Sequence, residues 1–311
     1  AARSLPMNSQ SNPMAESFSS SIAAPAPISV TRPFYWSVRR ELWENRSIYL
    51  APLGVAAVFL VGLLFTTILP GTTLGLQSIS PEHTATPYDI VAGLMMLTTI
   101  LVNVFYCSDA LYGERRDRSI LFWKSLPVSD LTTVLAKASI PLVIVPVVAW
   151  ASAVAVQWIV LLFSSLRLLA SGLSVSALWT EVSFFRMSLL LLYHIFTAHT
   201  LWPAPVYCWV LLVSGWTRRA TLLWAALPVV AIAGLEGIVF HTWHFAALVG
   251  GRLIGAAPAV DFRSPDTFPT NPMTHITPLH FLSSPSVWIG LLVAAVFLAA
   301  AVRLRHYQGP I

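Results

Sequence analysis

Long runs of apolar residues alternate with short polar segments along this 311-residue chain. A helix needs about 20 apolar residues to cross the hydrocarbon core of a bilayer, because each residue rises about 1.5 Å. By that measure the pattern predicts six spans, at residues 48–69, 88–108, 139–163, 184–213, 220–240 and 286–304. Prolines inside the third, fourth and fifth spans predict kinks, which neighbouring helices can accommodate by satisfying the freed carbonyl groups.

Three segments outside these spans have patterns of their own. Residues 34–46 place aromatic and aliphatic side chains on one helical face and charged side chains on the other, which is typical of a helix lying in the membrane interface. Residues 245–257 are apolar but too short to cross, so we expect a dipping or surface helix there. Residues 1–32, rich in Ser, Ala and Pro, predict a flexible tail in front of a single domain at 33–311.

Composition supports a membrane location and gives an orientation. Hydrophobic residues make up 56% of the chain and the mean hydropathy is +0.73, which is too apolar for a water-soluble domain and predicts an all-α membrane protein. With both termini cytoplasmic, 14 of the 18 Lys and Arg residues lie on the inner side, as the positive-inside rule requires. The net charge of +5 does not indicate nucleic-acid binding, because no long basic tract occurs.

One cytoplasmic segment, between the second and third predicted spans, is the strongest candidate for function. It begins with five consecutive charged residues, in a protein that is only 10% charged, and continues into a bulky apolar run. The residues concerned are Glu114, Arg115, Arg116, Asp117 and Arg118, followed by Leu121, Phe122 and Trp123. The pattern predicts about three helical turns from Glu114 to Lys124, with Pro127 ending them and Ser129 capping the next helix.

Aromatic side chains beside arginines are typical of the residues that dominate protein interfaces. Retention of the loop on the inner side would explain the arginines, but not the acidic residues or the aromatic tip. The segment is therefore predicted to bind a cytoplasmic partner. The chain contains no Gly-x-x-x-x-Gly-Lys-Ser/Thr phosphate loop, so any ATP used by the system would bind another protein.

Polar residues inside the spans form a second, weaker set of candidates. Asn103, His199 and Glu236 could line a transport path or a gate, since polar groups at membrane depth are costly unless they serve a purpose. For Glu236 a structural hydrogen bond to another helix is about as plausible. The histidines at 241, 244, 275 and 280 match no ligand spacing for a metal site, and we predict none. The two cysteines are expected to be buried without a disulfide.

Several segments together resemble the permease subunits of type-2 ATP-binding-cassette exporters. They are the interfacial stretch RRELWENRSIYLAP, the inner loop YGERRDRSILFWKSLPVSDLTTVLAK and the later LVSGWTRRATLLWAALP. The resemblance covers about residues 33–307. It implies an all-α fold of six transmembrane helices, with an N-terminal interfacial elbow helix and a half-inserted hairpin between spans five and six.

The resemblance also assigns roles and partners. The elbow helix corresponds to Phe34–Asn45, which includes Trp36, Arg39, Arg40 and Trp43. The coupling helix, which seats in a groove of the ATPase, corresponds to Glu114–Trp123. The implied protein is not itself an enzyme: a separate cytoplasmic subunit binds ATP and Mg²⁺, two permease copies form the pathway, and the location is the bacterial cytoplasmic membrane. The cargo does not carry over.

Two other functions compete with this one. The first is a membrane metal-handling protein or enzyme, with a site built from Glu236 and the histidines of the outer loop. The second is a stand-alone secondary transporter in which Glu236 titrates; the absence of a convincing internal repeat weighs against it. An ATPase partner would be expected for the exporter and for neither alternative.

Overall fold

The computed structural model describes residues 31–68, 81–170, 172, 174–176, 179, 184–254 and 278–309. Within these ranges the regular structure is helical. The first half comprises α2 (Thr31–Glu44), α3 (Ser47–Ile68), α4 (Pro81–Asp109), α5 (Tyr112–Arg116), α6 (Ser119–Ser125), α7 (Asp130–Ser139), the π-helix η1 (Ile140–Ile144) and α8 (Val145–Ala170). The second half comprises α10 (Phe184–Phe196), the π-helix η2 (Thr197–Leu201), α11 (Ala204–Trp216), α12 (Thr221–Phe240), α13 (His244–Ile254), α14 (Pro278–Ser283) and α15 (Pro285–Tyr307). The predicted tail at 1–32 lies almost entirely outside the described residues.

Five helices in the described ranges are long and apolar enough to cross a membrane, and the count becomes six if one bent pair is a single span. The bent pair joins α10 and η2 to α11, with an angle of 47° between its halves. Each of the six predicted spans coincides with one of these helices or with the bent pair. These helices indicate an integral membrane protein.

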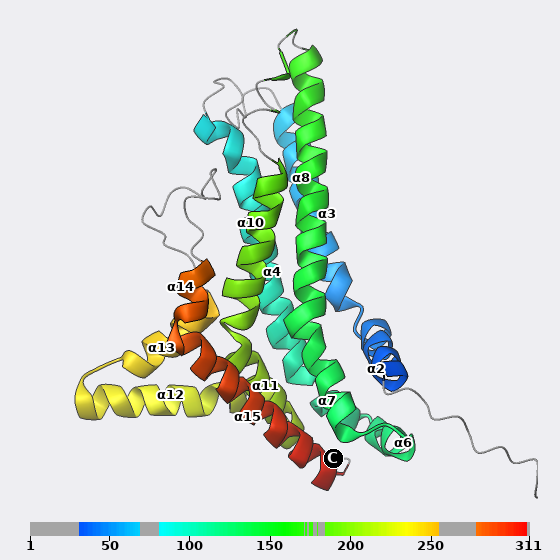
Figure 1. Cartoon of the computed structure of the whole chain (residues 1–311), viewed down its shortest axis with the longest axis vertical. Coiled ribbons are helices and arrows are strands. Elements are labelled where there is room, and N and C mark those ends of the chain that lie inside the picture. Colours follow the sequence, from blue (N-terminus) through cyan, green and yellow to red (C-terminus); the bar gives the residue numbers. More distant parts are fainter. Residues whose placement is uncertain are drawn as a thin grey trace, which may run out of the picture.

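Helices α3, α4 and α8 run side by side along the length of the molecule (Figure 1). Helix α4 packs against α3, α8 and α11, and α11 packs against α15. In the most apolar window of α4, 56% of the residues are buried, compared with 17% for α3 and 22% for α15. Helix α4 is therefore the centre of the bundle, and the outer helices present apolar surface to their surroundings.

Helices α12 and α13 form a hairpin that projects from the side of the bundle (Figure 1). The chain turns between them at His241, whose φ of 56° lies in the left-handed region. Helix α12 continues without a break through Pro228. Only 11% of its most apolar window is buried within the chain, and this surface needs lipid or another protein against it.

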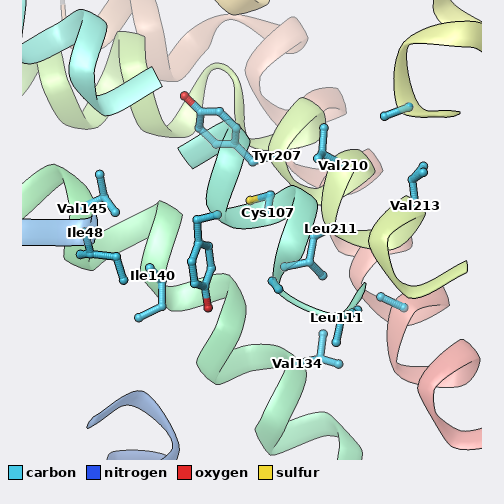
Figure 2. Packing of buried hydrophobic residues seen from close by; sticks show 14 residues of the cluster. Ile48, Cys107, Leu111, Val134, Ile140, Val145, Tyr207, Val210, Leu211 and Val213 are labelled. Atoms are coloured by element: carbon cyan, nitrogen blue, oxygen red, sulfur yellow. The ribbon is translucent and has the colours of Figure 1, made fainter. Parts of the chain in front are cut away.

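A hydrophobic core joins the central helices (Figure 2). Cys107 on α4 and Tyr207 on α11 are almost fully buried there, beside Ile140 of η1. Gly215 brings α11 close to its neighbours, because a Cβ at this position would lie 3.2 Å from Leu111. Both cysteines are buried and free, as predicted.

Candidate partner-binding site

The charged segment after α4 consists of two short helices instead of the single helix predicted from Glu114 to Lys124. Helix α5 ends at Arg116, and α6 begins at Ser119. Between them Arg118 has a φ of 58°, in the left-handed region that a continuous helix of L-residues does not enter. The prediction for the following helix is confirmed: Ser129 accepts a hydrogen bond from the backbone N–H of Thr132 at 3.1 Å and caps α7.

Glu114 lies inside the protein and not on the outer surface of this segment. Its side chain is 6% exposed and contacts three cations. Arg40 of α2 donates a hydrogen bond to it at 2.6 Å, and Arg305 of α15 donates another. The Lys137 Nζ atom is 3.2 Å away, on α7. A single carboxylate thus ties three other helices to α5.

Glu41 on α2 is the second buried acid of this network. It accepts hydrogen bonds from Lys137 at 2.9 Å, from Arg40 at 2.6 Å and from the hydroxyl group of Tyr106 at 2.8 Å. Burial alone would raise the pKa of Glu41, but the charges of Lys137 and Arg40 outweigh burial and hold that pKa below its ordinary value. Glu41 is therefore ionised at neutral pH.

We call the buried set around these two acids the charge network. Its members are Arg40, Glu41, Tyr106, Glu114, Asp130, Lys137 and Arg305. Arg305 also donates to Asp130 at 3.0 Å, so the network holds three acids and three cations. Buried charges persist only when they are paired and hydrogen-bonded. The network consequently fixes α2, α4, α5, α7 and α15 relative to one another.

Arg115 also points inward and has a separate structural role. Its Nη1 group donates to the carbonyl oxygens of Gly215 at 2.6 Å and Thr217 at 3.1 Å, and its Nε group donates to Gly309 at 3.4 Å. The last carbonyl groups of a helix have no donor within that helix. Arg115 therefore caps the end of α11, and any effect of Glu114 or Arg115 on a partner is indirect.

The outer surface of the segment is formed by the remaining predicted residues. Arg116, Asp117 and Arg118 are exposed, and Arg116 donates to Asp117 at 2.9 Å. Leu121 and Phe122 on α6 are 58% and 60% exposed. This part of the prediction, a charged surface with an apolar tip, agrees with the geometry.

Trp123 connects the exposed surface of α6 to the charge network. The Cζ atom of Arg40 lies 3.9 Å from the centroid of the Trp123 ring, a cation–π contact. Phe122 also packs against Trp123 in an edge-to-face arrangement, with 4.9 Å between the two ring centroids. The next residue, Lys124, donates to the carbonyl oxygens of His306 and Gln308 at 3.3 and 2.8 Å. Helix α6 is thus attached to both α2 and the end of α15.

The remaining residues assigned to the elbow helix lie on α2, which is an amphipathic helix as predicted. Trp36 and Trp43 are 57% and 67% exposed. The Arg39 guanidinium group lies between them, with its Cζ atom 5.1 Å from the Trp36 centroid and 4.8 Å from the Trp43 centroid. The opposite side of α2 packs against α7.

Asn103 and His199 are each associated with a π-helical turn: Asn103 bonds to η1, and His199 lies in η2. In η1 the Val145 N–H group bonds to the Ile140 carbonyl oxygen, five residues back. In that register the Pro141 carbonyl group would pair with residue 146, a proline without an N–H. Asn103 on α4 supplies the missing donor, from Nδ2 at 3.1 Å.

The second π-turn also accepts a side-chain hydrogen bond, at the His199 carbonyl oxygen. The Tyr207 hydroxyl group donates to this oxygen at 3.1 Å. Turns η1 and η2 contact each other and α4. Asn103 and His199 are therefore parts of paired helix breaks, which are frequent at functional sites.

Glu236 caps a helix end. Its carboxylate accepts backbone hydrogen bonds from His244 at 2.9 Å and Phe245 at 2.8 Å, at the start of α13, and a third from the Thr242 hydroxyl group at 2.9 Å. The first N–H groups of a helix have no partner within it, and a carboxylate there is favourable. These contacts match the structural alternative for Glu236, and they fix the α12–α13 hairpin.

The predicted histidines do not gather within the described ranges. His241 and His244 are exposed on the hairpin, and residue 275 lies outside the described residues. In the part of the chain that the structure describes, no group of three His, Cys, Asp or Glu side chains is placed to hold a metal ion.

Sequence reasoning missed the partners that hold the site together, namely Glu41, Tyr106, Lys137 and Arg305. In the sequence, Lys137 and Arg305 are recognisable only as basic residues near the ends of spans. They lie 23 and 191 residues from Glu114, and a single sequence gives no signal for such pairings. The only sequence feature that indicated such pairing was the presence of acidic and basic residues at the same ends of several spans.

Comparisons with known proteins add no family assignment: no protein-family model, curated protein or solved structure matches this chain. What is established is a helical protein with five to six candidate membrane spans. Its function must be argued from the geometry just described.

Proposed function

We propose that this chain is the membrane-spanning permease subunit of an ATP-driven exporter, and that α6 docks on a separate cytoplasmic ATPase. ATP and Mg²⁺ would bind to that ATPase, and this chain would contribute no catalytic residue. The proposal includes the topology predicted from charge, with six spans and both termini in the cytoplasm. It places α2 as the elbow helix and the α12–α13 hairpin as half-inserted.

The contact between Trp123 and Arg40 is the observation that supports this function best. A surface loop needs no buried attachment if it only retains a membrane orientation. Here the exposed helix α6 is joined through Trp123 to a network that links five other helices. Such an attachment is what a force-transmitting surface requires, because a push on a loosely held helix would be lost in local motion.

The proposed mechanism begins with closure of two ATPase subunits when ATP binds. Their movement would displace α6 through Leu121 and Phe122, the exposed side chains available for an apolar groove. Displacement of Trp123 would move Arg40 and α2, and Lys124 would carry the motion to the end of α15. The paired π-turns lie farther along the same bundle, where two spans can bend.

A second copy of this chain would complete the pathway. The large apolar surface that α12 leaves uncovered, with Leu223 64% exposed and Val230 68% exposed, requires either lipid or protein contact. Pairing of two copies would leave one α6 on each side for one ATPase subunit each. The chemistry of the cargo is not part of the proposal.

Purification of the tagged chain from its native membranes in mild detergent tests this function. The purified sample should hydrolyse ATP, and mass spectrometry should identify a protein with a phosphate-loop sequence in it. Phe122→Ala should remove both. Phe105→Ala is the matched control, because Phe105 is equally exposed, at 60%, but lies on α4, outside the α5–α6 segment. Equal ATPase recovery from the two variants would contradict the proposal.

A further inference from the structure

The outer face of α2 carries a cation held between two aromatic rings. Arg39 lies over Trp36 and Trp43, and both rings are more than half exposed. The three residues follow the spacing i, i+3 and i+7, which puts them on one helical face. Within the described part of the chain, no carboxylate pairs with Arg39 and no hydrogen-bond partner is found for either indole N–H.

The acidic residues of α2 interact with groups other than Arg39. Glu41 faces the charge network and is 1% exposed, and Glu44 lies 3.5 Å from Arg40. Three arginines, Arg32, Arg39 and Arg46, make the outward side of this region mainly positive, and the one exposed acid, Glu44, pairs with Arg40. We propose that Trp36, Arg39 and Trp43 bind the phosphate group of an anionic phospholipid at the membrane surface.

The geometry favours an anionic headgroup over a choline headgroup. Two facing aromatic rings can hold a quaternary ammonium group, but here the cation between the rings is already supplied by Arg39. The guanidinium edge remains available to donate in-plane hydrogen bonds to phosphate oxygens, and the indole N–H groups can add to them. Tryptophan also prefers the headgroup depth of a bilayer, where this phosphate lies.

The consequence is a fixed depth and orientation for α2. Arg40 and Glu41, two members of the charge network, also lie on α2. A lipid bound to Arg39 would therefore help to fix the position of these two residues. Loss of the lipid would remove the membrane anchor of α2 and leave the helix held by the charge network and by its packing against α7. The lipid site does not depend on the ATPase partner, so either proposal can fail while the other stands.

The test uses the full chain reconstituted in nanodiscs that contain phosphatidylcholine and phosphatidylglycerol in equal amounts. After extraction into mild detergent, native mass spectrometry measures the ratio of the two lipids that remain bound. Wild type should retain phosphatidylglycerol preferentially, and Arg39→Gln should lower that preference about fivefold, the factor for one basic residue near an anionic surface. Arg303→Gln, at an exposed arginine on α15, is the matched control and should leave the ratio unchanged.

Two further variants separate the aromatic contribution from charge alone. Trp36→Leu with Trp43→Leu keeps Arg39 but removes the flanking rings and the indole donors, and it should also lower the preference. Arg39→Lys keeps the charge and should give an intermediate value. An unchanged lipid ratio in Arg39→Gln, or an equal loss in Arg303→Gln, would overturn the proposal. Circular dichroism of each variant verifies that the helices remain folded.

Discussion

The Arg40 guanidinium group lies on the ring of Trp123, 3.9 Å from its centroid, while its Nη2 atom bonds to Glu41 and Glu114 at 2.6 Å each. One side chain therefore joins the exposed helix α6 to two buried acids. A cation–π contact contributes about 0.5–2 kcal/mol, more when water is excluded. In the proposed function, a load applied to α6 would reach the helix bundle through this pair.

Trp123→Leu is predicted to loosen α6 without unfolding the protein. The variant loses the ring beneath Arg40 but keeps an apolar side chain, so we expect stability to fall by about 1 kcal/mol. A double-mutant cycle with Arg40→Gln, measured by thermal unfolding in detergent, should give a coupling energy of at least about 0.5 kcal/mol. Strict additivity of the two single effects would show that the contact carries no energy.

Lys137→Met is predicted to destabilise the chain much more strongly. It leaves Glu41 and Glu114 close together with one buried cation fewer, and breaking a buried charge pair costs about 3–5 kcal/mol. Adding Glu41→Gln to this variant should recover part of the loss, because the unpaired buried charge is removed. Urea or detergent unfolding followed by tryptophan fluorescence measures both. A Lys137→Met variant that is as stable as wild type would contradict the stabilising role of the charge network.

The charge network should also give a defined dependence of stability on pH. The pKa of Glu41 lies below its ordinary value of 4.5 in the folded protein, so its contribution is fully present above about pH 4.5 and is lost as pH falls through the lowered pKa. The free energy of unfolding of wild type minus that of Glu41→Gln should stay constant from about pH 5 to pH 8. It should shrink at lower pH. A difference that grows on acidification would contradict the assignment.

Asn103→Leu is predicted to disturb the paired π-turns. The substitution leaves the Pro141 carbonyl oxygen buried without a donor, which costs about 1–3 kcal/mol. Thr99→Val, one helical turn earlier on α4, is the control, because Thr99 bonds only to the Met95 carbonyl oxygen of its own helix. Hydrogen exchange should rise around residues 140–146 in the first variant and not in the second. Equal hydrogen exchange in the two variants would contradict the role of Asn103 in stabilising η1.

Glu236→Ala is predicted to loosen the α12–α13 hairpin. The first N–H groups of α13 lose their acceptor, and loss of a helix cap costs about 1 kcal/mol. Glu236→Gln keeps an amide oxygen at the same place and should have a smaller effect on hydrogen exchange in α13. A titrating gate would behave differently: both variants would then abolish the pH dependence of transport equally.

The positions of the spans could be predicted from the sequence because each is an apolar run long enough to cross a bilayer. The amphipathic helix at 34–46 was also predictable, from its helical periodicity. The direction of Glu114 and Arg115 was not, because their partners, Arg305 and Gly215, are far away in the chain and become neighbours only through packing. The helix break at Arg118 could not be predicted either, because neither residue next to Arg118 is a glycine or a proline, which would indicate a turn.

The most direct test of the central claim asks what touches α6 in the native membrane. A photo-crosslinking amino acid would replace Leu121, which is 58% exposed on α6, or Leu223, which is 64% exposed on α12. We predict that position 121 crosslinks to a protein with a phosphate-loop sequence, that ATP with vanadate changes the yield, and that position 223 gives no such product. Absence of this product at position 121, in membranes where the chain is folded, would contradict the account.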